Sequence, residues 1–138
     1  MKTGDGFGFA EIEHTADWAL RVWAPDLGRL FSQAAAGMYW LMETALVDGP
    51  GVEKKIELNA IDAEALLVSF LSELLYLGES EGLGFDDLPV DIQGSRLVVT
   101  ARGAPIESQK KEIKAVTYHN LAIQQHENGY QVTIVFDV

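Results

Sequence analysis

Carboxylate groups stand at two distant places in the sequence, and together they could hold a divalent cation. Asp17 ends the stretch "EHTAD" near the N-terminus, and Asp137 comes one residue before the α-carboxylate of Val138 in "VTIVFDV". Hard cations take several oxygen ligands held close together, and negative groups clustered without a cation repel one another. Residues 17 and 137 meet only if the first and last strands share one edge of the domain. On the strand pattern alone, Asp137 could equally be a solvated side chain at a strand end.

The N-terminal stretch also allows a catalytic interpretation. Glu13, His14, Thr15 and Asp17 fall within five positions, and a hydrolase would use His14 as a general base that a carboxylate orients. No nucleophile lies in a recognisable motif, and Thr15 directly beside His14 has poor geometry for a triad. Two alternatives therefore stay open: a small metal-dependent hydrolase that uses Asp17, His14 and Asp137, and a structural histidine held by hydrogen bonds.

Lys114 is the third candidate, in the stretch "EIKAVTYHNL". It shares a strand parity with Val116 and Tyr118, so it lies on an apolar pattern. Its ammonium group could reach a phosphate or a carboxylate of a partner. Its alkyl chain could also simply cover apolar surface while the charge stays in water.

Two helices are predicted among the elements that must position these side chains. Asp26 follows Pro25 and can cap a helix that begins at Leu27, and a second helix begins near Asp62 and stops near Gly78. Apolar residues recur at helical spacing in both segments. In the first they are Leu27, Leu30, Phe31, Ala34, Ala35, Met38, Leu41 and Met42, and in the second Leu66, Leu67, Phe70, Leu71, Leu74 and Leu75.

The remaining periodic segments alternate between apolar and polar residues, which is typical of strands. The predicted strands cover residues 17–24, 53–60, 88–102 as two strands about a Gly94–Ser95 turn, 113–119, and 121–138 as a hairpin with a type I′ turn at Asn128–Gly129. Two helices that bury one face each against a mainly antiparallel sheet make an α+β domain, a two-layer sandwich.

Composition narrows the classes of function. The chain has 138 residues, of which 48% are hydrophobic and 22% charged, as in ordinary globular domains. The formal net charge of −11 disfavours stable binding to nucleic acid, which needs Lys and Arg at many phosphates. The absence of cysteine excludes disulfides, a thiolate zinc site and a cysteine nucleophile.

Length and the N-terminal sequence set the expected organisation. We expect a single domain over residues 1–138, with residues 1–8 as a flexible segment. The start "MKTGDGFGFAEIEH" has no apolar stretch of the kind that secretory signals carry. No apolar run is long enough to cross a bilayer. We therefore expect a cytoplasmic protein without a membrane partner.

Read in order, the motifs resemble those of the archease family. The resemblance is carried by "HTADWALRV", "LFSQAAAGMYWLM", "LLVSFLSELLYLGESEGLGF", "EIKAVTYHNL" and the terminal "VTIVFDV". Their order and spacing match from about residue 9 to the end of the sequence. Each motif is short, but the ordered set is specific. The resemblance also implies a sandwich of helices on a bowed sheet, in agreement with the pattern.

The resemblance implies a helper protein and not an enzyme. Archeases assist the RtcB-type RNA ligase of tRNA splicing and RNA repair. They promote guanylylation of the ligase histidine, support multiple turnover and broaden the choice of nucleotide. The expected partner is such a ligase, and the expected cofactor is a divalent ion, Ca²⁺, Mg²⁺ or Mn²⁺.

The family's site residues map onto positions of this chain that match its motifs. The resemblance implies metal ligands at Asp17, Asp137 and Val138, and a functional lysine at Lys114. His14 and Glu13 are expected to contact the partner or nucleotide, and no residue is expected to be catalytic.

Two positions and one stretch depart from the family pattern, and none of them contains a proposed metal ligand. Glu13 stands where many archeases have Asp, Asn120 stands where Gly is common, and the stretch from Gly103 to Glu112 looks short.

A third class of function, a chaperone-like or adaptor module, has only the acidic composition in its favour. That alternative predicts that loss of Asp17 and Asp137 leaves activity unchanged.

Overall fold

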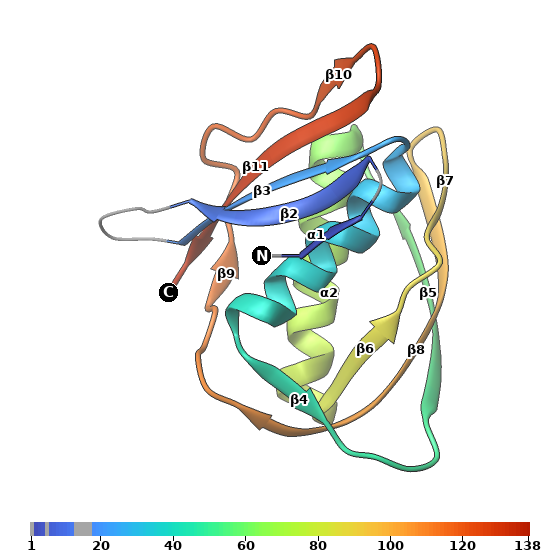
Figure 1. Ribbon diagram of the computed structural model, residues 1–138. Helices are drawn as coiled ribbons and strands as arrows, with labels where there is room; N and C mark the ends of the chain where they lie inside the picture. Colours follow the sequence, from blue (N-terminus) through green and yellow to red (C-terminus); the bar gives the residue numbers. More distant parts are fainter. Residues whose placement is uncertain (1, 5, 13–17) are drawn as a thin grey trace.

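The structure is a computed structural model, and it describes residues 2–4, 6–12 and 18–138. These residues form two helices and eleven strands (Figure 1). The helices are α1 (Leu27–Leu41) and α2 (Ala63–Glu81). The strands are β1 (Lys2–Gly4), β2 (Phe7–Ile12), β3 (Trp18–Ala24), β4 (Thr44–Leu46), β5 (Val52–Asn59), β6 (Leu83–Asp87), β7 (Asp91–Gln93), β8 (Arg96–Gln109), β9 (Ala115–Val116), β10 (Gln124–His126) and β11 (Gly129–Asp137).

The first sheet joins the two ends of the sequence. Its strand order is β1-β2-β3-β11-β10, and β9 also pairs with β11. Strand β11 runs antiparallel to β3, from Tyr130 opposite Ala24 to Phe136 opposite Trp18. The last strand therefore lies inside this sheet and not at its edge.

The second sheet is built around the long strand β8, with which β4, β5, β6 and β7 all pair antiparallel. The α+β class, with two helices on antiparallel sheet, is confirmed. The described strands divide between two hydrogen-bonded sheets, where the alternating pattern was compatible with one. Alternation shows which side chains share a face, but it does not show which strands pair.

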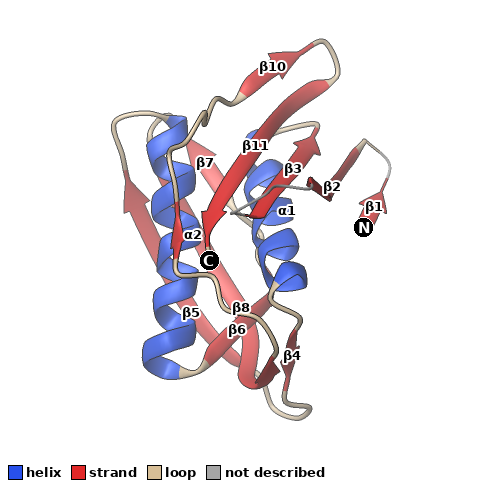
Figure 2. Ribbon diagram, turned by 90° about the vertical axis from the view of Figure 1, so that its left-hand side faces the viewer, coloured by secondary structure: helices blue, strands red, loops and turns tan. Residues whose placement is uncertain are grey.

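The helices lie between the two sheets (Figures 1 and 2), and α1 packs mainly on β2 and β3. Helix α2 packs on β5, β6 and β8 of the second sheet and on β9 of the first. Every apolar residue predicted for the faces of the two helices belongs to the core or packs against it. Burial of these apolar faces is the main force that holds the helices against the two sheets.

Both predicted helix starts are confirmed, whereas the predicted end of the second helix is wrong. Asp26 accepts a hydrogen bond from the amide of Arg29 at 2.8 Å, and Asp62 accepts one from the amide of Ala65 at 2.7 Å. Helix α2 continues past Gly78 to Glu81, and Gly82 ends it with φ of 67°. That left-handed conformation costs glycine little, so the stop signal is the second glycine.

Smaller differences concern the strands. The hairpin of β10 and β11 is confirmed, but its loop residues are Glu127 and Asn128, and neither has positive φ, so the turn is not type I′. The expected strand over 113–119 is reduced to β9. Strand β6 was not predicted, and the segment 1–8 contributes β1 and the start of β2.

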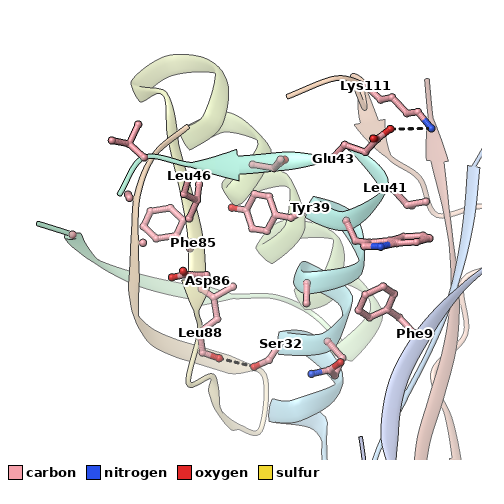
Figure 3. Close-up of a pocket in the computed structure, with 18 of the residues that line it drawn as sticks. Phe9, Ser32, Tyr39, Leu41, Glu43, Leu46, Phe85, Asp86, Leu88 and Lys111 are labelled. Atoms are coloured by element: carbon pink, nitrogen blue, oxygen red, sulfur yellow. Dashed lines mark hydrogen bonds and ion pairs between the residues drawn. The ribbon is translucent and has the colours of Figure 1, made fainter. Parts of the chain in front are cut away.

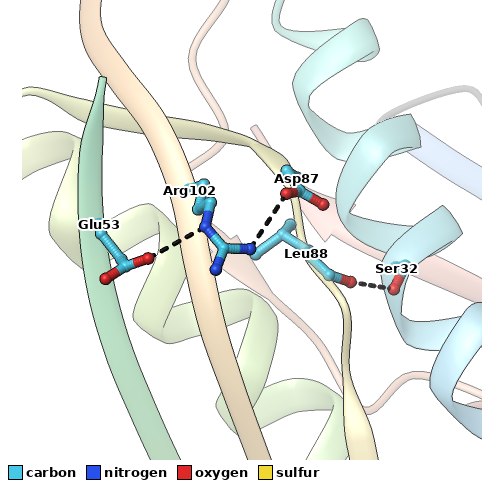
Figure 4. A network of polar contacts seen from close by, with 5 residues as sticks. All are labelled: Ser32, Glu53, Asp87, Leu88 and Arg102. Carbon is cyan, nitrogen blue, oxygen red and sulfur yellow. Dashed lines mark hydrogen bonds and ion pairs between the residues drawn. The ribbon is translucent and has the colours of Figure 1, made fainter. Parts of the chain in front are cut away.

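A polar network ties the second sheet to α1 (Figure 4). Arg102 on β8 donates to Glu53 on β5 at 3.0 Å and to Asp87 on β6 at 3.4 Å. The hydroxyl of Ser32 on α1 donates to the carbonyl of Leu88 at 2.5 Å. The ion pairs are exposed, so each adds well under about 1 kcal/mol to stability. The Ser32–Leu88 hydrogen bond joins the residue directly after β6 to α1.

Within the described ranges, neither helix is long and apolar enough to cross a membrane.

Candidate functional site

The end of β11 is held from both sides. Phe136 pairs with Trp18 of β3 on one side and with Val116 of β9 on the other, and its side chain is fully buried. The alternation of β11 then turns Asp137 away from the core, and its side chain is exposed. The Asp137 carboxylate is therefore presented by a backbone that two neighbouring strands fix.

Lys114 lies directly beside this strand end. Its amide donates a hydrogen bond to the Asp137 carbonyl at 2.8 Å, and Asp137 pairs with the next residue, Ala115. Further along, the amide and the hydroxyl of Thr117 both donate to the Val135 carbonyl, at 3.0 and 2.9 Å. These contacts hold the stretch 114–117 against β11, so Lys114 and Asp137 are neighbours although 23 positions separate them in the sequence.

The predicted site residues therefore fall into two groups. Lys114, Asp137 and Val138 come together at the end of β11, where β9 pairs with it. Glu13, His14 and Asp17 lie outside the described residues. No group of three His, Asp or Glu side chains that could hold a metal ion occurs among residues 2–4, 6–12 and 18–138. The metal site stays a prediction, for which the described part supplies the side chain of Asp137 and the carboxylate of Val138.

The turn after β9 explains one departure from the family pattern. Asn120 has φ of 51°, in the left-handed region that glycine favours and that Asn tolerates better than most residues. Its side-chain amide lies 3.4 Å from His119 Nε2, and the His119 amide donates to the Thr117 hydroxyl at 3.2 Å. Asn can thus replace Gly here without changing the path of the chain, and the turn leaves Tyr118 59% exposed.

The sequence interpretation missed Lys111 and Glu43. The amides of Lys110 and Lys111 both donate to the Met42 carbonyl, at 3.0 and 3.1 Å, which docks this segment at the end of α1. The Lys111 ammonium lies 3.4 Å from a Glu43 carboxylate oxygen and 5.6 Å from the centroid of the Trp18 ring. The charged run "KKEIK" was the only sequence signal, and it did not identify these partners.

The hydroxyl of Tyr39 on α1 is buried and makes no well-aligned hydrogen bond within the described part of the chain, although the backbone of Phe85 lies near it. Burial raises the pKa of its hydroxyl far above the ordinary value, and the neighbouring backbone of Phe85 opposes this shift only in part. Figure 3 shows the ring between α1 and Phe85 on β6. The hydroxyl thus stays protonated across the physiological range, and it has no role as an acid or a base there.

Comparison with protein families gives one match that spans most of the chain. Residues 9–138 match the model of the archease protein family (MTH1598/TM1083). The chain is 37% identical over 125 residues to protein archease of Thermococcus gammatolerans, which covers 85% of this chain and 88% of that protein. It is 33% identical over 136 residues to protein archease of Methanopyrus kandleri, which covers 93% of this chain and 97% of that protein.

Two solved structures resemble the fold over nearly its whole length. The solution structure of protein 1598 of Methanobacterium thermoautotrophicum aligns with a TM-score of 0.71 at 26% identity, over 98% of this chain and all of that one. The crystal structure of an archease from Thermotoga maritima, described as a possible chaperone, aligns with a TM-score of 0.70 at 26% identity. That alignment covers 92% of this chain and 94% of the other.

Proposed function

The chain belongs to the archease family, and from that premise we propose that it is a protein activator of an RtcB-type RNA ligase. In this proposal it promotes guanylylation of the ligase histidine, supports repeated turnover and broadens nucleotide use. It acts in the cytoplasm as a helper of tRNA splicing and RNA repair, and not as an enzyme. With a net charge of −11, it would contact the ligase and not the RNA backbone.

The observation that supports the proposal is that neighbouring strands fix the backbone at the end of β11. The Lys114 amide is 2.8 Å from the Asp137 carbonyl, and Phe136 is paired on both sides. The ammonium group of Lys114, the side-chain carboxylate of Asp137 and the terminal carboxylate of Val138 would thus be presented together at one rigid strand end. Rigid presentation favours docking because little conformational freedom is lost when the partner binds.

We propose that a divalent ion, Ca²⁺, Mg²⁺ or Mn²⁺, binds at the end of β11. Asp137 and the carboxylate of Val138 provide the hard oxygen donors such ions prefer. Asp17, which lies outside the described residues, is the third ligand in the proposal because the family resemblance implies it. A bound ion would supply positive charge for the nucleotide phosphates. Ca²⁺ takes six to eight oxygen ligands, waters included, so three ligand residues of this chain would leave positions for a partner or for water.

The chain's own residues would bind and orient. Lys114 would place its ammonium against a nucleotide phosphate or a ligase carboxylate, and His14 and Glu13 would add contacts to the same partner. Positioning and electrostatic complementarity are the main means by which nucleotidyl transfer is accelerated, so no acid or base from this chain is required.

The test is a ligation assay under multiple turnover with purified ligase. Asp137→Asn keeps the shape of the side chain and removes one charge, and it should abolish most of the stimulation. Asp91→Asn, on an exposed strand of the other sheet, is the matched control and should stimulate normally. Full stimulation by a folded Asp137→Asn protein would rule out the proposed metal site at the end of β11.

Two further assays separate the other classes of function. The metal-dependent hydrolase predicts turnover of phosphoesters by the isolated chain with Mg²⁺ or Mn²⁺, and the activator predicts none. A chaperone-like role, suggested by the description of the Thermotoga maritima relative, predicts suppression of aggregation that survives Asp137→Asn.

A further inference from the structure

A groove runs along the face of α1 that neither sheet covers (Figure 3). Its volume is about 1180 Å³. The floor is the exposed side of α1, one wall comes from β2 and β3, and the other comes from β4, β6 and the loop after β4. The Ser32–Leu88 hydrogen bond joins α1 to the second wall, and the Glu43–Lys111 ion pair lies near the end of α1.

The floor and walls of the groove are rich in aromatic and aliphatic surface. The ring of Phe9 on the first wall and the ring of Trp40 on the floor lie 5.8 Å apart between centroids. Trp40 is 39% exposed and Val47 is 42% exposed, unusually high for large apolar side chains that line a cavity. Covering this surface with a partner's apolar side chains removes it from water, which favours binding.

The charge of the lining is strongly one-sided. Its described residues include four carboxylates and one ammonium, and Glu43 already pairs with that ammonium on Lys111. The other three carboxylates, on Glu11, Asp48 and Asp86, are exposed and have no ion-pair partner among the described residues. An incoming group with positive charge would therefore find unpaired counter-charges on both walls and on the loop.

Lys111 already shows how this lining receives a cation. Its ammonium lies 5.6 Å from the centroid of the Trp18 ring and 3.4 Å from a Glu43 carboxylate oxygen. A ring face combined with a carboxylate is a favourable site for an ammonium or guanidinium group. The groove offers the same two kinds of group elsewhere, with Trp40 on its floor and carboxylates on its walls.

We propose that this groove binds a basic, partly apolar peptide segment of a protein partner. Its Lys or Arg side chains would pair with Glu11, Asp48 and Asp86, while its apolar side chains cover Trp40 and Val47. The volume exceeds the range of about 300–1,000 Å³ that is usual for small-molecule sites, and the separated charges suit an extended chain. This inference does not depend on the proposed function, since it concerns the isolated chain.

The experiment measures binding of a fluorescein-labelled peptide that alternates leucine and arginine, by fluorescence anisotropy with the purified chain. The triple variant Glu11→Gln, Asp48→Asn, Asp86→Asn should bind about tenfold more weakly, because three exposed ion pairs are lost. A peptide with glutamate in place of arginine should not bind measurably. Circular dichroism checks that the variants are folded.

The matched control removes the same number of charges elsewhere. Asp91→Asn, Glu107→Gln and Glu127→Gln change exposed carboxylates that do not line the groove, and this triple variant should bind within about twofold of the parent. An equal loss in both triple variants would overturn the proposal, because the attraction would then come from net charge alone.

The aromatic floor has its own control pair. Trp40→Ala should weaken peptide binding several-fold, whereas Trp23→Ala should not, because Trp23 lies outside the lining and its ring is covered by Arg21 at 5.2 Å. Unchanged affinity in Trp40→Ala would overturn the proposal. Displacement of the peptide by spermine at an equal concentration would also overturn it, in favour of a small polycation as the occupant.

Discussion

Replacing Tyr39 by phenylalanine should stabilise the protein. The Tyr39 hydroxyl is buried and makes no well-aligned hydrogen bond in the described part of the chain, and an unsatisfied buried group of this kind costs about 1–3 kcal/mol. Phenylalanine keeps the ring between α1 and Phe85 and removes only the oxygen. We expect the free energy of unfolding to rise by about 1 kcal/mol, which raises Tm by roughly 4 °C for a domain of this length.

The pH dependence of stability gives a second test of the same prediction. Burial raises the pKa of the Tyr39 hydroxyl in the folded protein, while the unfolded chain keeps the ordinary value of about 10. The unfolded state therefore loses its proton first as the pH rises, and ionisation favours unfolding. The stability that this group contributes is fully present below about pH 10 and is lost above it. The advantage of Tyr39→Phe should widen over that range.

Urea unfolding followed by circular dichroism, at about pH 7 and about pH 10.5, measures both effects. Tyr76→Phe is the control, since Tyr76 is 59% exposed and loses a hydroxyl that water already satisfies. It should leave stability unchanged at both pH values. A less stable Tyr39→Phe protein would refute the reasoning, because it would mean that the hydroxyl has a partner, such as an ordered water.

Three other predictions follow from the geometry. Amidation of the Val138 carboxylate should weaken Mn²⁺ and Ca²⁺ binding in calorimetry, whereas an N-terminal tag should have little effect, and equal affinities would contradict the terminal ligand. Gly103→Ala should destabilise the protein by about 1–3 kcal/mol in thermal unfolding, since a Cβ there would overlap the Gly84 carbonyl oxygen. Asp62→Ala should cost about 1 kcal/mol in the same measurement, because the cap of the Ala65 amide is lost.

Local features of the fold could be predicted because they depend on neighbouring residues. Asp26 caps its helix as expected, and Asp62, near which the second helix was expected to begin, caps α2, since a capping side chain needs only the amides three residues on. The end of α2 could not be chosen correctly, because Gly78 and Gly82 are both plausible stops and only the second has positive φ. Strand β6 was missed because its short segment forms a strand only by pairing with β8.

The candidate site depends on pairings that sequence spacing does not contain. The neighbourhood of Lys114 and Asp137 follows from β9 docking on β11, and alternation in the two segments gave no sign of it. The groove combines residues of α1, β2, β4 and β6, so its acidic lining appeared in the sequence only as scattered charges. Family resemblance supplied the expected roles of Asp137 and Lys114, and the structure supplied their proximity.

The end of β11 shows why an exposed Asp137 can still be well placed. A terminal residue usually frays, because few contacts oppose its motion. Here Phe136 is fully buried and paired on both sides, and the Asp137 carbonyl accepts a hydrogen bond from Lys114. The backbone is thus fixed by contacts that do not involve the Asp137 carboxylate. Substitution of that carboxylate should leave folding intact, so that loss of function in Asp137→Asn would report on the site itself.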